Sequence, residues 1–269
     1  MTRSFLSYKK KRYPTLRQRA DICRVTLRRN IIMALPFVKK KVIMSRTACF
    51  GKDLIDLKFG TKNVFIWNQQ KTRADVFMEY INGATRPKWR TVAPFLKRND
   101  VWYLIEQQEL LPWLHLRKTP DYIIMDSLAE LTDKKITHKK EGWSFCSHIS
   151  DLDITSDFNE IFTIEGLLSE EKLEESYSVF FEWIAERYKK MPIYFIHYPT
   201  TFDPRDLYKR RGKLILEIMQ KLAKKDPFIH NIFLDDSRVF PYEYDSYPYH
   251  YSSETNLEFK KLLDEDGRN

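Results

Sequence analysis

The stretch KVIMSRTACFGKDLIDLK, residues 41–58, decides the fold class of this chain of 269 residues. The apolar run Val42–Ser45 predicts a buried strand, and the amphipathic pattern of Phe50–Phe59 predicts a helix. Small residues and a cysteine lie between the two. This order places Cys49 at the carboxyl end of a strand and on the opening turn of a helix, where unpaired N–H groups favour an anion. Cys49 is therefore our first candidate nucleophile.

Outward from this stretch, strand-like and helix-like patterns alternate along the chain. We expect further strands at 63–67, 122–125, 193–198 and 228–234, and helices at 74–82, 99–111, 169–189, 206–223 and 254–263. The segment 132–157 is polar and less regular. The alternation predicts a three-layer αβα fold with a mostly parallel sheet, whose functional residues lie at the carboxyl ends of the strands. We predict one α/β domain, residues 41–269, preceded by a basic arm, residues 1–40.

The basic arm accounts for the net charge of +9, because residues 1–41 hold thirteen lysines and arginines and one acid. Apolar residues recur at steps of three and four from Thr15 to Leu35, which predicts an amphipathic helix. Such a helix can lie on an anionic membrane, dock on a partner or bind a polyanion, or it can pack on its own domain. No base-reading motif is present, so we do not expect nucleic acid as a partner.

Composition excludes several classes of protein. Seven glycines are too few for a glycine-rich phosphate loop, and no apolar run reaches the length of a membrane span. The basic N-terminus lacks an apolar segment of the secretory type. Cys23, Cys49 and Cys146 form no CxxC pair, and no HExxH pattern occurs. We therefore expect a cytoplasmic protein without a metal or a tightly bound cofactor, with the arm as the part that could reach the inner membrane face.

His250 is the candidate partner of Cys49. It lies in the segment Asp245-Ser-Tyr-Pro-Tyr-His250, just before the last predicted helix. A catalytic histidine needs a carboxylate to fix its tautomer, and Asp245 is close enough in sequence to supply one, with Asp235 and Asp236 as competitors. The structural alternatives are a buried cysteine without catalytic function and a surface histidine in an aromatic loop.

Four further residues follow predicted strands and are candidates for substrate binding. Asp126 ends the strand at 122–125 and could contact substrate or cap the next helix. Asn68 and Arg73 follow the second strand and could donate to an oxyanion or a substrate. His197 ends a later strand and could line the same cleft.

Three motifs carry a resemblance to a known family. They are Thr47-Ala48-Cys49-Phe50-Gly51-Lys52-Asp53, the apolar strand Asp121–Asp126 with Glu130 four residues later, and Asp245 followed by His250-Tyr251-Ser252. With these motifs the chain resembles the SGNH hydrolase-like superfamily, and within it a bacterial branch linked to capsule and surface-polysaccharide synthesis, which opens on a Gly-Ser-Cys turn. Thr47 and Ala48 replace the Gly and Ser of that turn. The acid and the histidine are five residues apart here, whereas three is usual in the superfamily.

The resemblance implies transfer of an acyl group, in the first place acetyl, to or from a sugar hydroxyl. Cys49 would attack the carbonyl, His250 would act as base and then acid, and Asp245 would orient the imidazole. Backbone N–H groups at Cys49–Phe50 would stabilise the oxyanion. The resemblance also suggests acetyl-CoA as donor, its phosphates meeting Lys52 or Arg73, and a polysaccharide synthase as partner of the arm.

Two other classes of function remain open. One is a non-catalytic, hydrolase-like protein that binds glycan or partner proteins, for which Ala48 in the serine position is the main support. The other is a nucleotide-sugar glycosyltransferase, which the α/β pattern permits.

Overall fold

The computed structural model describes residues 40–98, 101–116, 118–189, 191–244 and 246–266. The predicted arm, including its helix and Cys23, lies outside the described residues, and so does Asp245. Within the described ranges, no helix combines the length and the apolar composition that crossing a bilayer would require.

The centre of the fold is a five-stranded parallel sheet in the order β2-β1-β3-β7-β8. Four of the five strands are short, mostly apolar runs that are buried along most of their length, as expected for a parallel sheet covered on both faces, whereas the edge strand β8 (IHNI) is buried only at its two end residues. The strands are β1 (Lys41–Arg46), β2 (Val64–Asn68), β3 (Tyr122–Asp126), β7 (Ile193–Ile196) and β8 (Ile229–Ile232).

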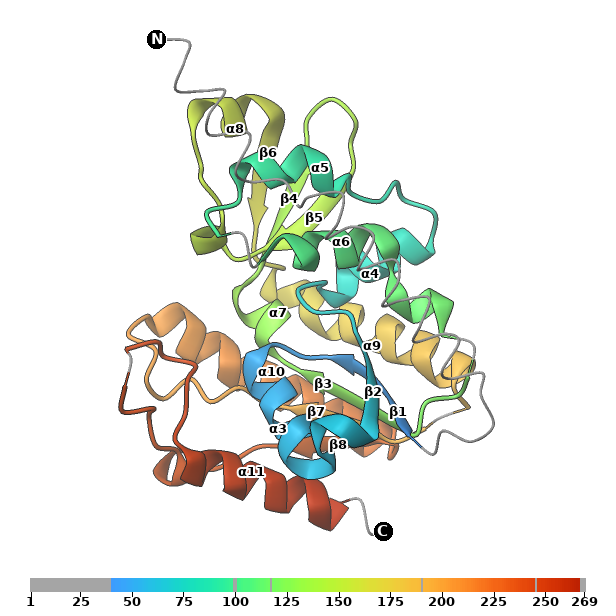
Figure 1. The fold of residues 1–269 in the computed structure, drawn as a ribbon, viewed down its shortest axis with the longest axis vertical. Coiled ribbons are helices and arrows are strands. Elements are labelled where there is room, and N and C mark those ends of the chain that lie inside the picture. Colours follow the sequence, from blue (N-terminus) through green and yellow to red (C-terminus); the bar gives the residue numbers. More distant parts are fainter. Residues whose placement is uncertain (1–39, 99–100, 117, 190, 245, 267–269) are drawn as a thin grey trace.

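Helices cover both faces of this sheet, which confirms the predicted three-layer α/β fold (Figure 1). One face carries two helices that pack on each other, α3 (Cys49–Phe59) and α11 (Ser253–Asp266). The other face carries α4 (Ala74–Ile81), α9 (Glu170–Arg187) and α10 (Asp206–Lys225), with α9 in contact with both neighbours. The helices bury one apolar side each, which is why their sequences show helical periodicity.

A second, three-stranded antiparallel sheet lies beyond α4 and the short helix α7 (Leu128–Thr132) (Figure 1). Its order is β5-β4-β6, and an aromatic core separate from that of the parallel sheet lies under it. Part of it falls in 132–157, which the sequence predicted to be irregular. Its elements are β4 (Lys134–His138), β5 (Ser144–Ser147), β6 (Phe162–Gly166), α5 (Trp89–Val92), α6 (Trp102–Leu110) and α8 (Ser156–Ile161).

The strand order places a reversal between β1 and β3. The chain passes from β1 outward to β2 on one side, and then returns to β3 on the other side. Loops therefore diverge above the carboxyl ends of these two strands, and open α/β sheets bind their ligands at this point. β1 ends at Arg46 and β3 at Asp126, so the turn that carries Cys49 lies at the reversal.

Candidate active site

Cys49 is the first residue of α3, and its side chain is exposed. Ala48 occupies the N-cap position with extended backbone and contributes no side-chain cap. The turn is tight at Gly51: a Cβ there would lie 2.7 Å from Thr47 Cβ and 2.9 Å from Asp126 Oδ2. Only glycine allows the helix to start this close to β3.

Two of the N–H groups at the start of α3 already have partners. The Ala48 N–H donates to Asp126 Oδ2 at 2.6 Å, and the Phe50 N–H donates to the Tyr198 hydroxyl at 3.1 Å. The predicted oxyanion donors at Cys49–Phe50 are thus not both open, because a substrate oxygen would compete with Tyr198 for the Phe50 N–H.

Asp126 joins the loop that follows β1 to the loop that follows β3, at the reversal point. Its carboxylate accepts from the Ala48 N–H and from the Leu128 N–H at 3.1 Å, so it holds the turn before α3 and satisfies the first N–H of α7. The residue is 2% exposed, and burial raises the pKa of the carboxyl to about 7 in spite of these hydrogen bonds. Of the two roles left open by the sequence, the capping role is present.

The thiol of Cys49 is not activated by its position on the helix. The surrounding protein displaces water from it, and the carboxylates of Asp53 and Asp126 lie within electrostatic range, so the pKa of the thiol is raised above its ordinary value. Lys71 acts in the opposite direction but more weakly. Cys49 is therefore a neutral thiol at pH 7, whereas a helix N-terminus alone would favour the thiolate.

His250 is exposed in the loop before α11. Its backbone N–H donates to the Tyr247 carbonyl at 3.1 Å, and the centroid of its ring lies 4.7 Å from that of the Tyr247 ring. Burial raises the pKa of Asp53, while Lys52 and His250 act to lower it. Asp53 is one helical turn after Cys49, so its carboxylate interacts with both members of the predicted pair. Sequence reasoning missed this role, although the spacing of four residues on one helix signals it.

Lys71 links the two sheets beside the site. Its ammonium lies 2.7 Å from Oδ2 of Asp151, which follows β5, and 3.5 Å from Oδ1 of Asp133, which follows α7. Its backbone is left-handed, with φ of 59°, a conformation that costs energy in a non-glycine residue and needs support from its surroundings. Burial raises the pKa of Asp133 to about 6.

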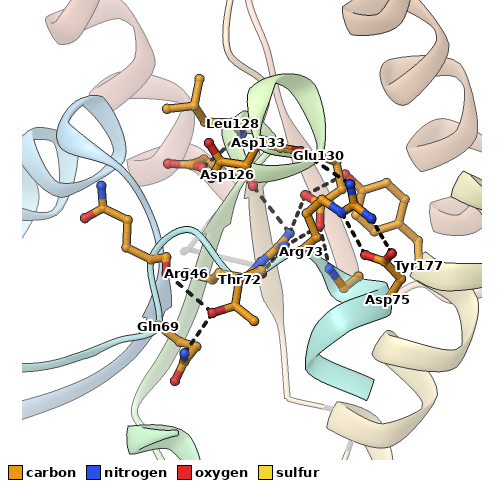
Figure 2. A network of polar contacts seen from close by, with 12 residues as sticks. Arg46, Gln69, Thr72, Arg73, Asp75, Asp126, Leu128, Glu130, Asp133 and Tyr177 are labelled. Carbon is orange, nitrogen blue, oxygen red and sulfur yellow. Dashed lines mark hydrogen bonds and ion pairs between the residues drawn. The ribbon is translucent and has the colours of Figure 1, made fainter. Parts of the chain in front are cut away.

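A buried polar network lies behind the site (Figure 2). The Arg46 guanidinium pairs with the Glu130 carboxylate through two nitrogens, and their side chains are 1% and 0% exposed. Glu130 also accepts from the Ala74 N–H at 2.8 Å and from the Tyr177 hydroxyl at 3.1 Å. The network joins the end of β1, the start of α4, α7 and α9. It fixes the loops that carry the site.

The side-chain amide of Asn68 hydrogen-bonds to the turn before Cys49. Its Nδ2 donates to the Thr47 carbonyl at 2.8 Å, and its Oδ1 accepts from the Thr47 N–H and the Ser45 hydroxyl, both at 3.0 Å. The amide is therefore engaged in positioning Thr47–Cys49, and it is not aimed as an oxyanion donor.

The other predicted binding residues are engaged elsewhere. Lys52 pairs with Asp56 along the surface of α3. Arg73 is 2% exposed, pairs with Asp75 at 2.5 Å and donates to the Gly166 carbonyl at 2.8 Å.

His197 lies in the interior under β8 and is not placed at the Cys49 turn. Its Nε2 bonds Asn231 Oδ1 at 2.9 Å, and burial lowers the pKa of the imidazole to about 4. The structure thus gathers Cys49, Asp53, Asp126, Lys71 and His250 around the reversal point.

Three comparisons with known proteins were made, by family, by sequence and by structure. No protein-family model matches the chain, and no curated protein matches it. Two solved structures are similar: a GDSL-like lipase from Bacteroides thetaiotaomicron, 10% identical with a TM-score of 0.43, and a proposed acylhydrolase from Bacteroides fragilis, 8% identical with the same score. The first alignment covers 88% of this chain and 94% of the lipase, and the second covers 86% and 88%.

Proposed function

We propose that this chain transfers an acyl group to or from a carbohydrate hydroxyl, with the Cys49 thiol as nucleophile. One observation carries the proposal: the thiol is exposed on the first residue of α3, where the strand order of the parallel sheet reverses. Open α/β sheets bind their ligands at such a reversal, so a substrate bound there would lie beside the sulfur. The carbohydrate, and a place in surface-polysaccharide synthesis, rest on the sequence resemblance.

In the proposed reaction the Cys49 sulfur attacks the acyl carbonyl carbon while His250 takes the thiol proton. Because the thiol is neutral at pH 7, proton transfer must accompany formation of the C–S bond. The carbonyl oxygen holds the electron pair, and its return expels the alcohol, which takes the proton from His250. A sugar hydroxyl or water then attacks the thioester by the same steps and releases Cys49.

Asp53 supports the proton transfer electrostatically. Its negative charge opposes the thiolate but stabilises a protonated imidazole, so it favours the state in which His250 holds the proton from Cys49. Asp245, the acid predicted from the sequence, stays a prediction.

The residues expected to bind acetyl-CoA give little support to it as the acyl donor. Lys52 and Arg73, the two cations expected to meet its phosphates, are each paired with an aspartate. These residues do not fit a phosphate-rich donor, and we assign no step to it.

A second candidate is a binding protein that has lost catalysis. The raised pKa of the Cys49 thiol and the occupation of the Ala48 and Phe50 N–H groups favour it, since both reduce the stabilisation of an anion at this turn.

Steady-state assays separate the two candidates. We would measure hydrolysis of p-nitrophenyl acetate, and acetyl transfer to oligosaccharides, by the full chain and by Cys49→Ala, His250→Ala and Cys23→Ser variants. The first two substitutions should each lower kcat/KM by about 1000-fold or more, and Cys23→Ser should change little. Equal turnover by the unaltered chain and the Cys49→Ala variant would exclude the thiol as nucleophile, and absence of turnover in every variant would leave the binding protein.

We also propose that residues 1–40 attach the protein to an anionic membrane surface. The support is the sequence alone, with thirteen cations and one acid in residues 1–41. Flotation with phosphatidylglycerol vesicles should recover the full chain and lose the 41–269 fragment; recovery of both would refute the assignment.

A further inference from the structure

The loop before α11 presents a series of aromatic rings to solvent. Tyr242, Tyr244 and Tyr247 are 42%, 82% and 48% exposed. The ring centroids of Tyr244 and Tyr242 are 5.3 Å apart, those of Tyr242 and His250 6.5 Å, and those of His250 and Tyr247 4.7 Å. The contacts run in one series, and we call these four residues the tyrosine strip.

The loop is fastened to the scaffold beneath the strip. The buried Tyr249 hydroxyl donates to Asp203 Oδ2 at 2.5 Å, and the buried Tyr251 hydroxyl donates to the Pro199 carbonyl at 2.7 Å. The Tyr242 N–H donates to the His250 carbonyl at 3.0 Å. These three hydrogen bonds hold Tyr242, Tyr249 and Tyr251 in place, which reduces the cost of ordering the described part of the loop when a ligand binds.

One end of the strip lies at the candidate active site. Partial burial raises the pKa of the Tyr247 hydroxyl, and Lys71, Asp133, Asp151 and Cys49 act on it as well. In Figure 1 the loop, in orange-red, lies at the end of the sheet where α3 begins. A ligand along the rings would therefore extend from the Cys49 thiol outward.

The charge around the strip excludes a phosphate-rich ligand. Residues 241–251 contain two acids and neither lysine nor arginine. The neighbouring cations Lys71, Arg205 and Arg238 are paired with Asp151, Asp203 and Glu258. Nucleic acids and nucleotides also stack on aromatic rings, but they require cations for their phosphates.

We infer that the tyrosine strip binds a neutral oligosaccharide and presents one of its sugar hydroxyls to Cys49. The face of an aromatic ring is electronegative, and it attracts the C–H bonds of a pyranose, which the sugar oxygens polarise. Phenolic hydroxyls at the ring edges can exchange hydrogen bonds with the sugar hydroxyls. The rings contact one another edge to face, with interplanar angles of 62°, 88° and 60° along the series, so successive rings turn separate faces to solvent and can each contact a different sugar unit of one chain.

Saturation-transfer NMR and calorimetric titration test the binding directly. The probes are maltohexaose, cellohexaose and chitohexaose, with tetramethylammonium and inorganic phosphate as non-sugar competitors. The proteins are the unaltered chain, the Tyr242→Ala/Tyr244→Ala double variant, the Tyr244→Phe variant and the Tyr103→Ala variant. Tyr103 is the matched control, because it is 41% exposed but belongs to α6.

The double variant should raise the Kd for the bound hexasaccharide by about tenfold or more, by analogy with the loss of a stacked base. Tyr244→Phe keeps the ring and should retain most of the affinity, and Tyr103→Ala should leave it unchanged. Absence of saturation transfer to all three sugars, an unchanged Kd in the double variant, or displacement by tetramethylammonium or phosphate would each overturn the inference.

The role of the sugar as substrate rests on the proposed function, and a Cys49→Ala protein separates the two. If it binds the hexasaccharide normally but the unaltered chain shows no turnover, the proposed reaction fails and the binding surface stands. If turnover depends on Cys49 but the strip variants retain full affinity and KM, the binding surface fails and the reaction stands.

Discussion

The two sides of the Asp126 carboxylate are built in opposite ways. Behind it, Arg46 and Glu130 are buried, and four hydrogen bonds converge on the Glu130 carboxylate. In front of it, Cys49 and His250 are exposed, and the pKa of the thiol is raised. The fold therefore places its strongest polar contacts where they fix the loops, and leaves the chemical groups where a substrate can approach them.

Breaking the buried side should have the largest effect on stability. Glu130→Ala leaves the Arg46 guanidinium buried without its carboxylate, and it also removes the acceptor of the Ala74 N–H and the Tyr177 hydroxyl. We expect the free energy of unfolding to fall by about 3–5 kcal/mol. Urea denaturation followed by tryptophan fluorescence measures the change.

Glu174→Ala is the matched control, because it removes an ion pair with Lys221 at the surface. Exposed pairs contribute little, so its effect should be much smaller. Similar losses for the two variants would mean that the buried network does not support the loops as described.

Asp126 should give the protein a pH-dependent stability. Its pKa is about 7 in the folded chain and about 4 in an unfolded one, so between these values the folded state binds more protons and stability falls as pH rises. Asp126→Asn removes this contribution. The decrease in unfolding free energy from pH 5 to pH 8 should be smaller in the variant by up to about 3 kcal/mol, at about 1.4 kcal/mol per pKa unit.

Parallel urea titrations at pH 5 and pH 8 check this expectation. Asp133 contributes in the same direction, because burial raises its pKa to about 6, but it is present in both proteins. Asp157→Asn, an exposed site on α8, serves as control. An identical pH dependence in the Asp126→Asn variant would show that Asp126 is ionised at pH 5.

Most of the parallel sheet could be predicted from sequence, because β1, β2, β3 and β7 are mostly apolar runs, each closed by a polar residue. The second sheet could not. β4 (KKITH) mixes charged with apolar residues, and β5 (SFCS) has only two apolar residues between two serines. β4 is stabilised by pairing with β6, in which Thr137 lies opposite Thr163. Such pairing depends on tertiary position, which local patterns do not record.

For the candidate site, too, local sequence patterns predicted some of the residues and not others. The place of Cys49 follows from the local strand-turn-helix pattern. Lys71 could not be found, because its partner Asp151 is 80 residues away. Arg73 and His197 were expected in the cleft because they follow strands, but side-chain direction is set by packing, and both side chains turn into the interior.

Gly51→Ala tests the close contact between the Cys49 turn, on the exposed side of Asp126, and the Asp126 carboxylate itself. The new Cβ would lie within 3 Å of Thr47 and of Asp126 Oδ2, so the turn and the carboxylate would have to separate. We expect a loss of about 1–3 kcal/mol in unfolding free energy, as in overpacked cores. Lys52→Ala, on the exposed side of the same helix, is the control, and equal stabilities of the two variants would show that the turn has room.

The smallest predicted effect concerns the reactivity of the thiol. In a Cys23→Ser background, iodoacetamide should modify Cys49, while Cys146 stays protected by burial and by a pKa raised to about 12. The rate should rise with pH through a midpoint above about 8.5, the value for a free cysteine. Asp53→Asn removes a charge that opposes the thiolate, so the rate at pH 8 should increase by about two- to fivefold.

Asp56→Asn, on the next turn of α3, should change this rate less, since Asp56 pairs with Lys52. The same Asp53→Asn substitution should lower acyl transfer if the carboxylate stabilises a protonated His250, so reactivity and catalysis would move in opposite directions. A rise in both would mean that Cys49 acts as a preformed thiolate without help from His250. A fall in both the alkylation rate and the acyl transfer would mean that Asp53 maintains the conformation of the turn. The exposed groups in front of Asp126 would then need structural support from a carboxylate, as the buried groups behind it do.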